Sequence, residues 1–265
     1  MKNLILLFVI CFCSIFYSCD SKNKILKTET ANDLKEISFI TSDSIKIYGD
    51  LYEKDKSSPI ILLFHQGGSN ARAEYDSIIP KLISQGFNVL AIDQRMGGQY
   101  YGGYNRTVAQ IKDHIFGNPY SYCDAYNNLE GALNYVIGSG FTGNKILWGS
   151  SYSASLAIKL GNNHQTDISG VLAFSPASGG SMKNCLPDPY FESLKIPLLI
   201  FRPPNEMKSE NSKTQFEKAR RFGHQTYAAI NGVHGSSMLV KERVGADTSK
   251  AWEVVNLFLA KFKND

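Results

Sequence analysis

The feature that most constrains the fold is a series of short, almost continuously apolar runs separated by amphipathic segments. Each run is about as long as a strand, and strands buried on both faces of a parallel sheet have this character. Alternation of such runs with helical patterns predicts a doubly wound, mostly parallel α/β sheet. The predicted strands are residues 59–64, 87–92, 145–148, 168–174, 197–201 and 225–230, and the predicted helices are residues 71–84, 124–138, 152–160, 209–222 and 248–262.

Ahead of this pattern, residues 35–53 alternate loosely between apolar and polar side chains around the turn-forming residues 41–44. This favours an antiparallel hairpin at the start of the sheet. Residues 20–34 are polar and lack periodicity, which indicates a linker. The expected fold class is therefore α/β, with an N-terminal antiparallel hairpin and a mostly parallel sheet.

Composition bounds the class of protein. The 265 residues are 43% apolar and 20% charged, which is ordinary for a globular chain with a substantial core. This length, once a leader is removed, suits one α/β domain better than two small ones. The net charge of +4 is mild, and no basic stripe interleaved with aromatic residues occurs in the sequence. Nucleic acid is therefore not an expected partner.

The N-terminus has the layout of a secretory signal peptide. Lys2 precedes an apolar run from Leu4 to Phe16, and the segment ends at Ser18-Cys19. A transmembrane helix would need about 20 apolar residues, and this run is shorter. Ser18-Cys19 also resembles the bacterial lipobox, in which the cysteine becomes the lipidated first residue.

We therefore expect residues 1–18 to be a signal peptide, 19–34 a lipid-anchored tether with Cys19 as the lipidation site, and 35–265 the folded domain. The expected product is an exported lipoprotein that faces the periplasm or the cell surface and contacts the membrane through its anchor. A plain signal peptide with an incidental cysteine is the alternative.

Two cysteines remain for the folded domain, Cys123 and Cys185, because Cys11 and Cys13 would leave with the leader and Cys19 would carry lipid. Two cysteines in an oxidising compartment can form a disulfide. Two buried free thiols are the alternative, and the sequence leaves both open.

Residues 145–155 carry the strongest chemical motif. The predicted strand runs directly into Gly149-x-Ser151-x-Ser153, and a helix rich in small residues follows. This nearly matches the G-x-S-x-G nucleophile elbow, in which small residues flank a serine on a tight strand-to-helix turn. Ser150 and Ser153 lack small flanking residues in the required register, so Ser151 is the predicted nucleophile.

With this motif the sequence resembles the α/β-hydrolase superfamily, and within it the dienelactone-hydrolase-like and small esterase branches, over most of residues 35–263. The resemblance implies the α/β-hydrolase fold. Residues 64–68 (FHQGG) resemble the family's loop after the third strand. The resemblance implies an oxyanion hole formed by the backbone N–H of Gln66 or Gly67 together with that of Tyr152. Residues 93–98 resemble a turn that is usually structural in the family.

The expected general base is His234. It lies in Gly232-Val233-His234-Gly235, after the last predicted strand, and this matches the family's G-x-H-G pattern. The acid should follow the strand at 197–201, where Glu206 is the only carboxylate. The alternative is a surface glutamate that starts the next helix, with Asn205 or Asp188 orienting the histidine.

A long, weakly patterned stretch separates Asp93 from Cys123. Loops of this length inside a compact domain tend to be functional. Its tyrosines could line a site, although a loop that simply packs on the protein surface is equally compatible with the sequence. These tyrosines are Tyr100, Tyr101, Tyr104, Tyr120 and Tyr122.

The sequence contains neither metal-binding motifs nor a nucleotide-binding glycine loop, so no metal and no cofactor are expected. The predicted function is an exported serine hydrolase that cleaves a small-molecule carboxylic ester through Ser151, His234 and Glu206. The alternatives are a serine peptidase and a catalytically silent hydrolase-fold binding module.

Overall fold

The computed structural model describes residues 33–111 and 119–263, which all lie within one compact unit, 31–265. The predicted signal peptide, the lipidation site Cys19 and all but the last two residues of the predicted tether lie outside the described residues. The first strand begins at Asp33, two residues before the predicted start of the folded domain. Within the part of the chain that the structure describes, no helix is both long and apolar enough to cross a membrane.

The core is one eight-stranded sheet with the strand order β1-β2-β4-β3-β5-β6-β7-β8. β1 pairs antiparallel with β2, and β2 pairs antiparallel with β4. All remaining neighbours are parallel, which confirms the predicted mostly parallel sheet with an N-terminal hairpin. The strands are β1 (Asp33–Ile40), β2 (Lys46–Glu53), β3 (Ile60–Phe64), β4 (Asn88–Asp93), β5 (Lys145–Ser150), β6 (Gly170–Phe174), β7 (Leu198–Arg202) and β8 (Gln225–Ala228).

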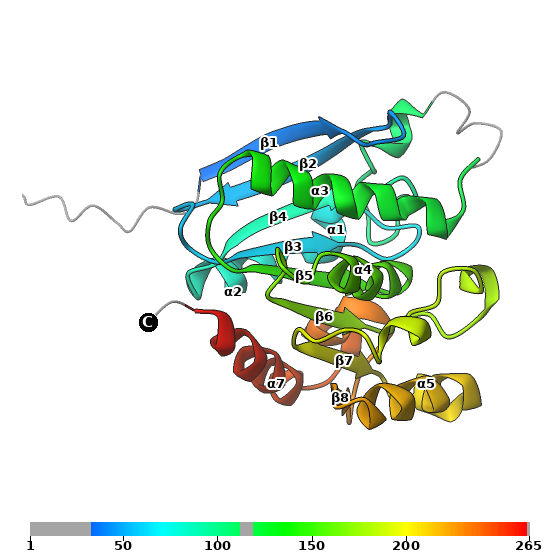
Figure 1. Cartoon of the computed structure of the whole chain (residues 1–265). Helices are drawn as coiled ribbons and strands as arrows, with labels where there is room; N and C mark the ends of the chain where they lie inside the picture. The colour runs from blue at the N-terminus through cyan, green and yellow to red at the C-terminus, as the bar shows by residue number, and fades with distance from the viewer. Residues whose placement is uncertain (1–32, 112–118, 264–265) are drawn as a thin grey trace, which may run out of the picture. The chain divides into compact units, whose positions relative to one another are not determined.

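Helices cover both faces of the sheet (Figure 1). One apolar cluster packs α3, α4 and α5 against one face, and a second packs α1, α2 and α7 against the other. Continuous apolar strands are needed because both faces are buried in this way. The helices are α1 (Ala71–Tyr75), α2 (Ile79–Ser84), α3 (Tyr126–Gly138), α4 (Tyr152–Asn163), α5 (Glu210–Arg221), α6 (Lys241–Val244) and α7 (Ser249–Leu259).

Two predicted elements differ from the observed ones. The predicted helix at 71–84 is two short helices, and Pro80 lies in the first turn of the second, where its missing N–H is harmless. The last predicted strand ends at Ala228, before Ile230, which is 77% exposed. β8 lies at the edge of the sheet and has only β7 beside it, so little holds its chain in register beyond four residues.

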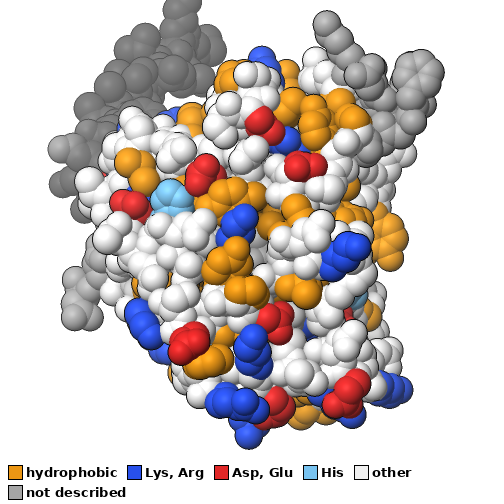
Figure 2. Space-filling view, turned by 45° about the vertical axis from the view of Figure 1, so that its right-hand side comes forward, with side chains coloured by type: hydrophobic (Ala, Val, Ile, Leu, Met, Phe, Trp, Pro, Cys, Tyr) orange, Lys and Arg blue, Asp and Glu red, His pale blue; other side chains and the backbone are white. Residues whose placement is uncertain are grey.

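The parallel strands place their carboxyl ends at one edge of the sheet, on the right-hand side of Figure 1. Ligands of open α/β sheets bind at this edge. Figure 2 turns this side forward and shows charged side chains of both signs scattered among hydrophobic ones.

The segment after β4 is fixed to the rest of the domain by ion pairs. Arg106 Nε donates to Asp93 Oδ2 at 2.6 Å, and the two terminal nitrogens of Arg95, Nη1 and Nη2, both donate to the carboxylate of Asp43. The turn at 93–98 is thus a structural anchor, as the family resemblance implies. A disulfide between Cys123 and Cys185 joins the 3-10 helix η3 (Tyr122–Ala125), which leads into α3, to the loop between β6 and β7.

Candidate active site

Ser151 lies at a sharp turn between β5 and α4. Its φ of 62° and ψ of −122° fall in a region that L-residues rarely adopt, and such strain is typical of functional positions. A Cβ on Gly149 would lie 2.5 Å from the backbone of Ala154, so only glycine fits there. The backbone therefore has the geometry that a nucleophile elbow requires.

Ser153 stands where the motif usually has glycine, and the structure shows how it fits. Its hydroxyl accepts the N–H of Ser150 at 2.9 Å and lies 2.6 Å from the carbonyl oxygen of Phe64, to which it donates. The side chain is fully buried and bridges β5 to β3. The hydroxyl thus has a structural function, and the departure from glycine leaves the turn intact.

The neighbouring Ser150 is also fully buried, and its Oγ accepts the N–H of Ser236 at 2.9 Å. Ser151 is partly exposed. Of the three serines in the motif, Ser151 is the one that a substrate can reach.

His234 and Glu206 form a short contact. Nδ1 of His234 lies 2.6 Å from Oε1 of Glu206, which is in the 3-10 helix η6 (Glu206–Lys208) directly after β7. The other two acid candidates are placed elsewhere, since Asp188 accepts a hydrogen bond from Gln215 and the side chain of Asn205 is exposed.

Ser151, His234 and Glu206 line one hollow of about 390 Å³. Among residues 33–111 and 119–263, no hydrogen bond joins Ser151 to His234. Catalytic hydrogen bonds of this kind are often long before substrate binds.

Arg202 holds the other side of the Glu206 carboxylate, a contact that the sequence analysis missed. Its Nη1 donates to Oε2 of Glu206 at 2.6 Å, and its Nη2 donates to the side chain of Gln215 at 2.6 Å. Arg202 is only 2% exposed. The one signal in the sequence is an arginine directly after the four apolar residues 198–201.

These contacts keep Glu206 ionised. Burial by itself would raise the pKa of Glu206, but the hydrogen bond and charge of His234, with the charge of Arg202, lower it below its usual range. An ionised carboxylate at Nδ1 fixes the imidazole tautomer and leaves Nε2 as a proton acceptor.

Hydrogen bonds of the buried His65 hold the loop after β3 in place. His65 donates from Nδ1 to the carbonyl oxygen of Gln66 and accepts the N–H of Gln94 at Nε2, at 2.7 and 2.8 Å. Burial lowers the pKa of His65, in keeping with this neutral tautomer. His65 thus shapes the loop and does not face the site.

Of the two predicted donors in this loop, Gln66 already has a partner. Its N–H donates to Oε2 of Glu74 at 2.8 Å. Gly67 is the remaining candidate, and a Cβ at that position would lie 2.8 Å from the hydroxyl of Tyr122. The ring of Tyr122 packs against that of Tyr152, with centroids 4.8 Å apart, so the two loops of the expected oxyanion hole lie side by side.

Glu74 is a second group that the sequence analysis missed. It is fully buried beneath this loop, and burial raises its pKa to about 7. Its position in the short helix α1 carries no motif, and only tertiary packing reveals it.

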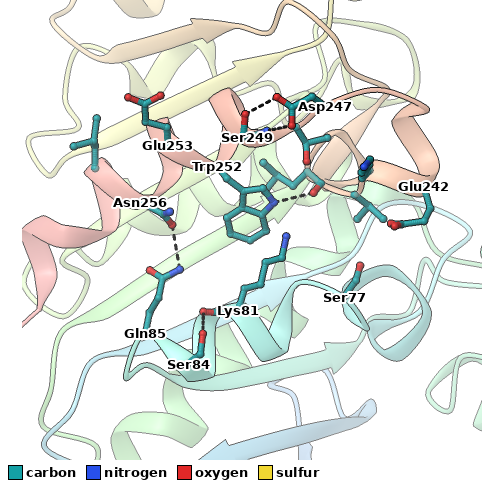
Figure 3. Close-up of a pocket in the computed structure, with 15 residues that line it drawn as sticks. Ser77, Lys81, Ser84, Gln85, Glu242, Asp247, Ser249, Trp252, Glu253 and Asn256 are labelled. Atoms are coloured by element: carbon teal, nitrogen blue, oxygen red, sulfur yellow. Dashed lines mark hydrogen bonds between the residues drawn. The ribbon is translucent and has the colours of Figure 1, made fainter.

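A larger hollow, of about 960 Å³, lies between α2 and α7 (Figure 3). Trp252 forms part of its wall, with its indole N–H on the carbonyl of Leu239 at 2.8 Å and Lys81 over its ring. It contains none of the predicted catalytic side chains. The candidate active site is therefore identified by its side chains and not by the volume of its hollow.

Within the described part of the chain, no group of three His, Cys, Asp or Glu side chains is placed to hold a metal ion. The arrangement at Ser151, His234 and Glu206 is instead suited to nucleophilic chemistry by a serine.

No protein-family model matches the sequence, and no curated protein matches it either. Solved structures do match. An esterase from Pyrococcus furiosus is 18% identical with a TM-score of 0.64, covering 88% of this chain and 94% of its own. A dienelactone hydrolase from Anabaena variabilis is 12% identical with a TM-score of 0.66, covering 88% and 99%. A carboxyl esterase from Bacillus coagulans, solved with glycerol, is 12% identical with a TM-score of 0.64, covering 86% and 98%.

At these identities the likeness shows the fold. The chain has the α/β-hydrolase fold, as the sequence resemblance implied, and its structural neighbours include esterases and dienelactone hydrolases.

Proposed function

We propose that this chain is a serine hydrolase that cleaves carboxylic esters of small molecules. The observation that carries the proposal is the 2.6 Å contact between His234 and Glu206 in the hollow that also contains Ser151 on its strained turn. The hydrolases among the structural neighbours support the same reaction class by analogy.

In the proposed reaction, Ser151 Oγ attacks the ester carbonyl while His234 Nε2 accepts the hydroxyl proton. The backbone N–H groups of Gly67 and Tyr152 bind the oxyanion of the tetrahedral intermediate. Collapse breaks the bond to the alcohol, which leaves with the proton from His234. Water, deprotonated by the same histidine, then hydrolyses the acyl-enzyme and releases the acid and free Ser151.

We further propose that the protein is exported and anchored by lipid at Cys19, as the N-terminal sequence indicates. The Cys123–Cys185 disulfide supports export, because disulfides persist mainly in oxidising compartments.

The test of the reaction compares the full chain with Ser151→Ala, Glu206→Gln and a control, Ser84→Ala, whose exposed serine is remote from the hollow. Turnover of a short-chain ester should fall at least about 10³-fold in Ser151→Ala and about 10²-fold or more in Glu206→Gln. The control should match wild type.

A fluorophosphonate should label wild type stoichiometrically at Ser151. If wild type neither hydrolyses esters nor reacts with the fluorophosphonate, the hydrolase proposal is wrong and a binding module with this fold replaces it. Turnover of amides but not esters would indicate a peptidase.

A further inference from the structure

A second hollow, of about 410 Å³, shares His234 with the hollow that contains Ser151. Gly67 and Gly68 form its floor, and Tyr100 and Tyr101 form its wall. Gly68 has open space where a side chain would be, so this floor is bare backbone. The hollow thus borders both the general base and the proposed oxyanion donor.

The two tyrosines present ring surface to solvent at this position. Tyr100 is 58% exposed and Tyr101 is 37% exposed, and their ring centroids lie 4.4 Å apart at an angle of 54°. Two tilted rings offer one face for stacking and one edge for a T-shaped contact, which is the arrangement that a third aromatic ring prefers.

Tyr101 is held in this position with a strained backbone. Its φ of 70° lies in the left-handed region, which non-glycine residues rarely adopt. Ser237 Oγ donates to its hydroxyl at 2.8 Å, and the guanidinium of Arg243 lies over its ring at 4.0 Å. A surface loop without a binding role would not need a tyrosine that is strained and held by two side chains but still exposes its ring.

The segment that carries the tyrosines is tied directly to the oxyanion loop. The N–H of Tyr100 donates to the carbonyl of Gly68 at 2.8 Å, and that of Gly98 donates to Ser69 at 2.8 Å. The rings are therefore fixed relative to the point where the ester carbonyl would lie.

The two tyrosine rings are the most exposed aromatic surface that lines this hollow, and the side chain of Gln66 in the same hollow is only 6% exposed. The hollow at Ser151, in contrast, is lined by the small polar residues Ser178, Ser212 and Asn211. A planar ring therefore finds its stacking partners in the hollow at the tyrosines and not in the hollow at Ser151.

We propose that Tyr100 and Tyr101 bind a planar aromatic group of the ester against the Gly67–Gly68 floor, so that aromatic esters are the preferred substrate class. This inference rests on the proposed ester hydrolysis. It makes the tyrosine pair a specificity determinant and leaves the triad unchanged.

The experiment measures kcat/KM by pH-stat for two matched pairs, ethyl benzoate with ethyl cyclohexanecarboxylate, and benzyl acetate with cyclohexylmethyl acetate. Each pair keeps ring size and removes planarity. The full chain should prefer the aromatic member of at least one pair by about tenfold or more.

Tyr100→Leu and Tyr101→Leu should reduce that preference to about twofold. Tyr100→Phe and Tyr101→Phe should retain the preference, because they keep the rings. Tyr104→Leu, an exposed tyrosine that does not line the hollow, is the control.

Equal rates within both pairs for wild type, or a preference that survives both leucine variants, would overturn the inference while ester hydrolysis stands. Failure of the proposed function looks different, since no ester at all would then turn over and the fluorophosphonate would leave Ser151 unlabelled.

Discussion

At the scale of single residues, the carboxylate of Glu206 lies between two partners. His234 contacts one of its oxygens and the buried guanidinium of Arg202 contacts the other, each at 2.6 Å.

Arg202 should influence the pH dependence of activity through Glu206. Replacing it by methionine removes a buried positive charge that helps to lower the pKa of Glu206, so the ionised carboxylate is lost at a higher pH. The acid limb of the kcat/KM profile should therefore move to higher pH by about one unit. The other charged group of this network, Asp188, remains, paired through Gln215.

Arg202→Lys is the matched variant, because it keeps the charge and loses the forked contacts. It should lower activity without moving the limb. A limb that stays in place in Arg202→Met would show that the arginine only supports the fold.

Glu74 predicts a pH dependence of stability. Its pKa is about 7 in the folded protein against an ordinary value of 4.5, so the folded state holds the proton more tightly. The free energy of unfolding should therefore fall by about 3 kcal/mol as the pH rises from about 4.5 to above 7.

Glu74→Gln should be the more stable protein at pH 8, because the amide stays neutral and its oxygen can still accept the N–H of Gln66. Urea unfolding of both proteins at pH 5 and pH 8 measures the difference. Parallel pH dependences would contradict the assignment.

The candidate catalytic residues follow from local patterns in the sequence. Small flanking residues at a strand end predict Ser151, flanking glycines predict His234, and the position after a strand predicts Glu206; their catalytic roles are proposals. Arg202 and Glu74 are buried in the fold, and no local motif marks either of them. Only the structure shows that the N–H of Gln66 already donates to Glu74, which leaves Gly67 as the proposed oxyanion donor.

At the scale of elements, the strands were predictable because burial on both faces leaves a continuous apolar run, as in β3. The ends of the elements are harder to predict. Between α1 and α2 the consecutive residues Ile78 and Ile79 are both buried, a local pattern that no helical period describes. The sequence does not decide whether Cys123 and Cys185 pair, because cysteine count does not reveal whether two side chains meet.

The disulfide should contribute strongly to stability, because it closes a long loop in the unfolded chain. Because the cysteines are 62 positions apart in the sequence, loss of the bond should lower the free energy of unfolding by about 4 kcal/mol. The expected fall in Tm is about 10 °C. The test is thermal unfolding of wild type and of Cys123→Ser/Cys185→Ser, each with and without reductant.

Reductant should lower the Tm of wild type and leave that of the double variant unchanged. Equal melting of all four samples would show that the bond adds no stability in solution.

At the scale of the whole molecule, the sequence patterns predict the α/β class and the α/β-hydrolase fold. The similarity to solved structures confirms this fold. Substrate preference could not be predicted, because it depends on which side chains line each hollow. The N-terminal segment lies outside the described residues, so its function is tested in cells.

Cys19→Ser should move the protein from the membrane fraction to the soluble exported fraction, because an acyl chain is the only expected anchor. Fractionation with and without detergent measures this. A variant that stays with the membrane would contradict lipidation at Cys19.

The hydroxyl of Ser153 has a mechanical consequence. It touches the backbone of both β5, which ends at the proposed nucleophile, and β3, which ends at the loop of the proposed oxyanion donor. We expect this shared contact to couple the thermal displacements of the two strand ends. In the proposed reaction, the attacking oxygen and the groups that receive the negative charge would then move together, and the distance between them would change less than the position of either.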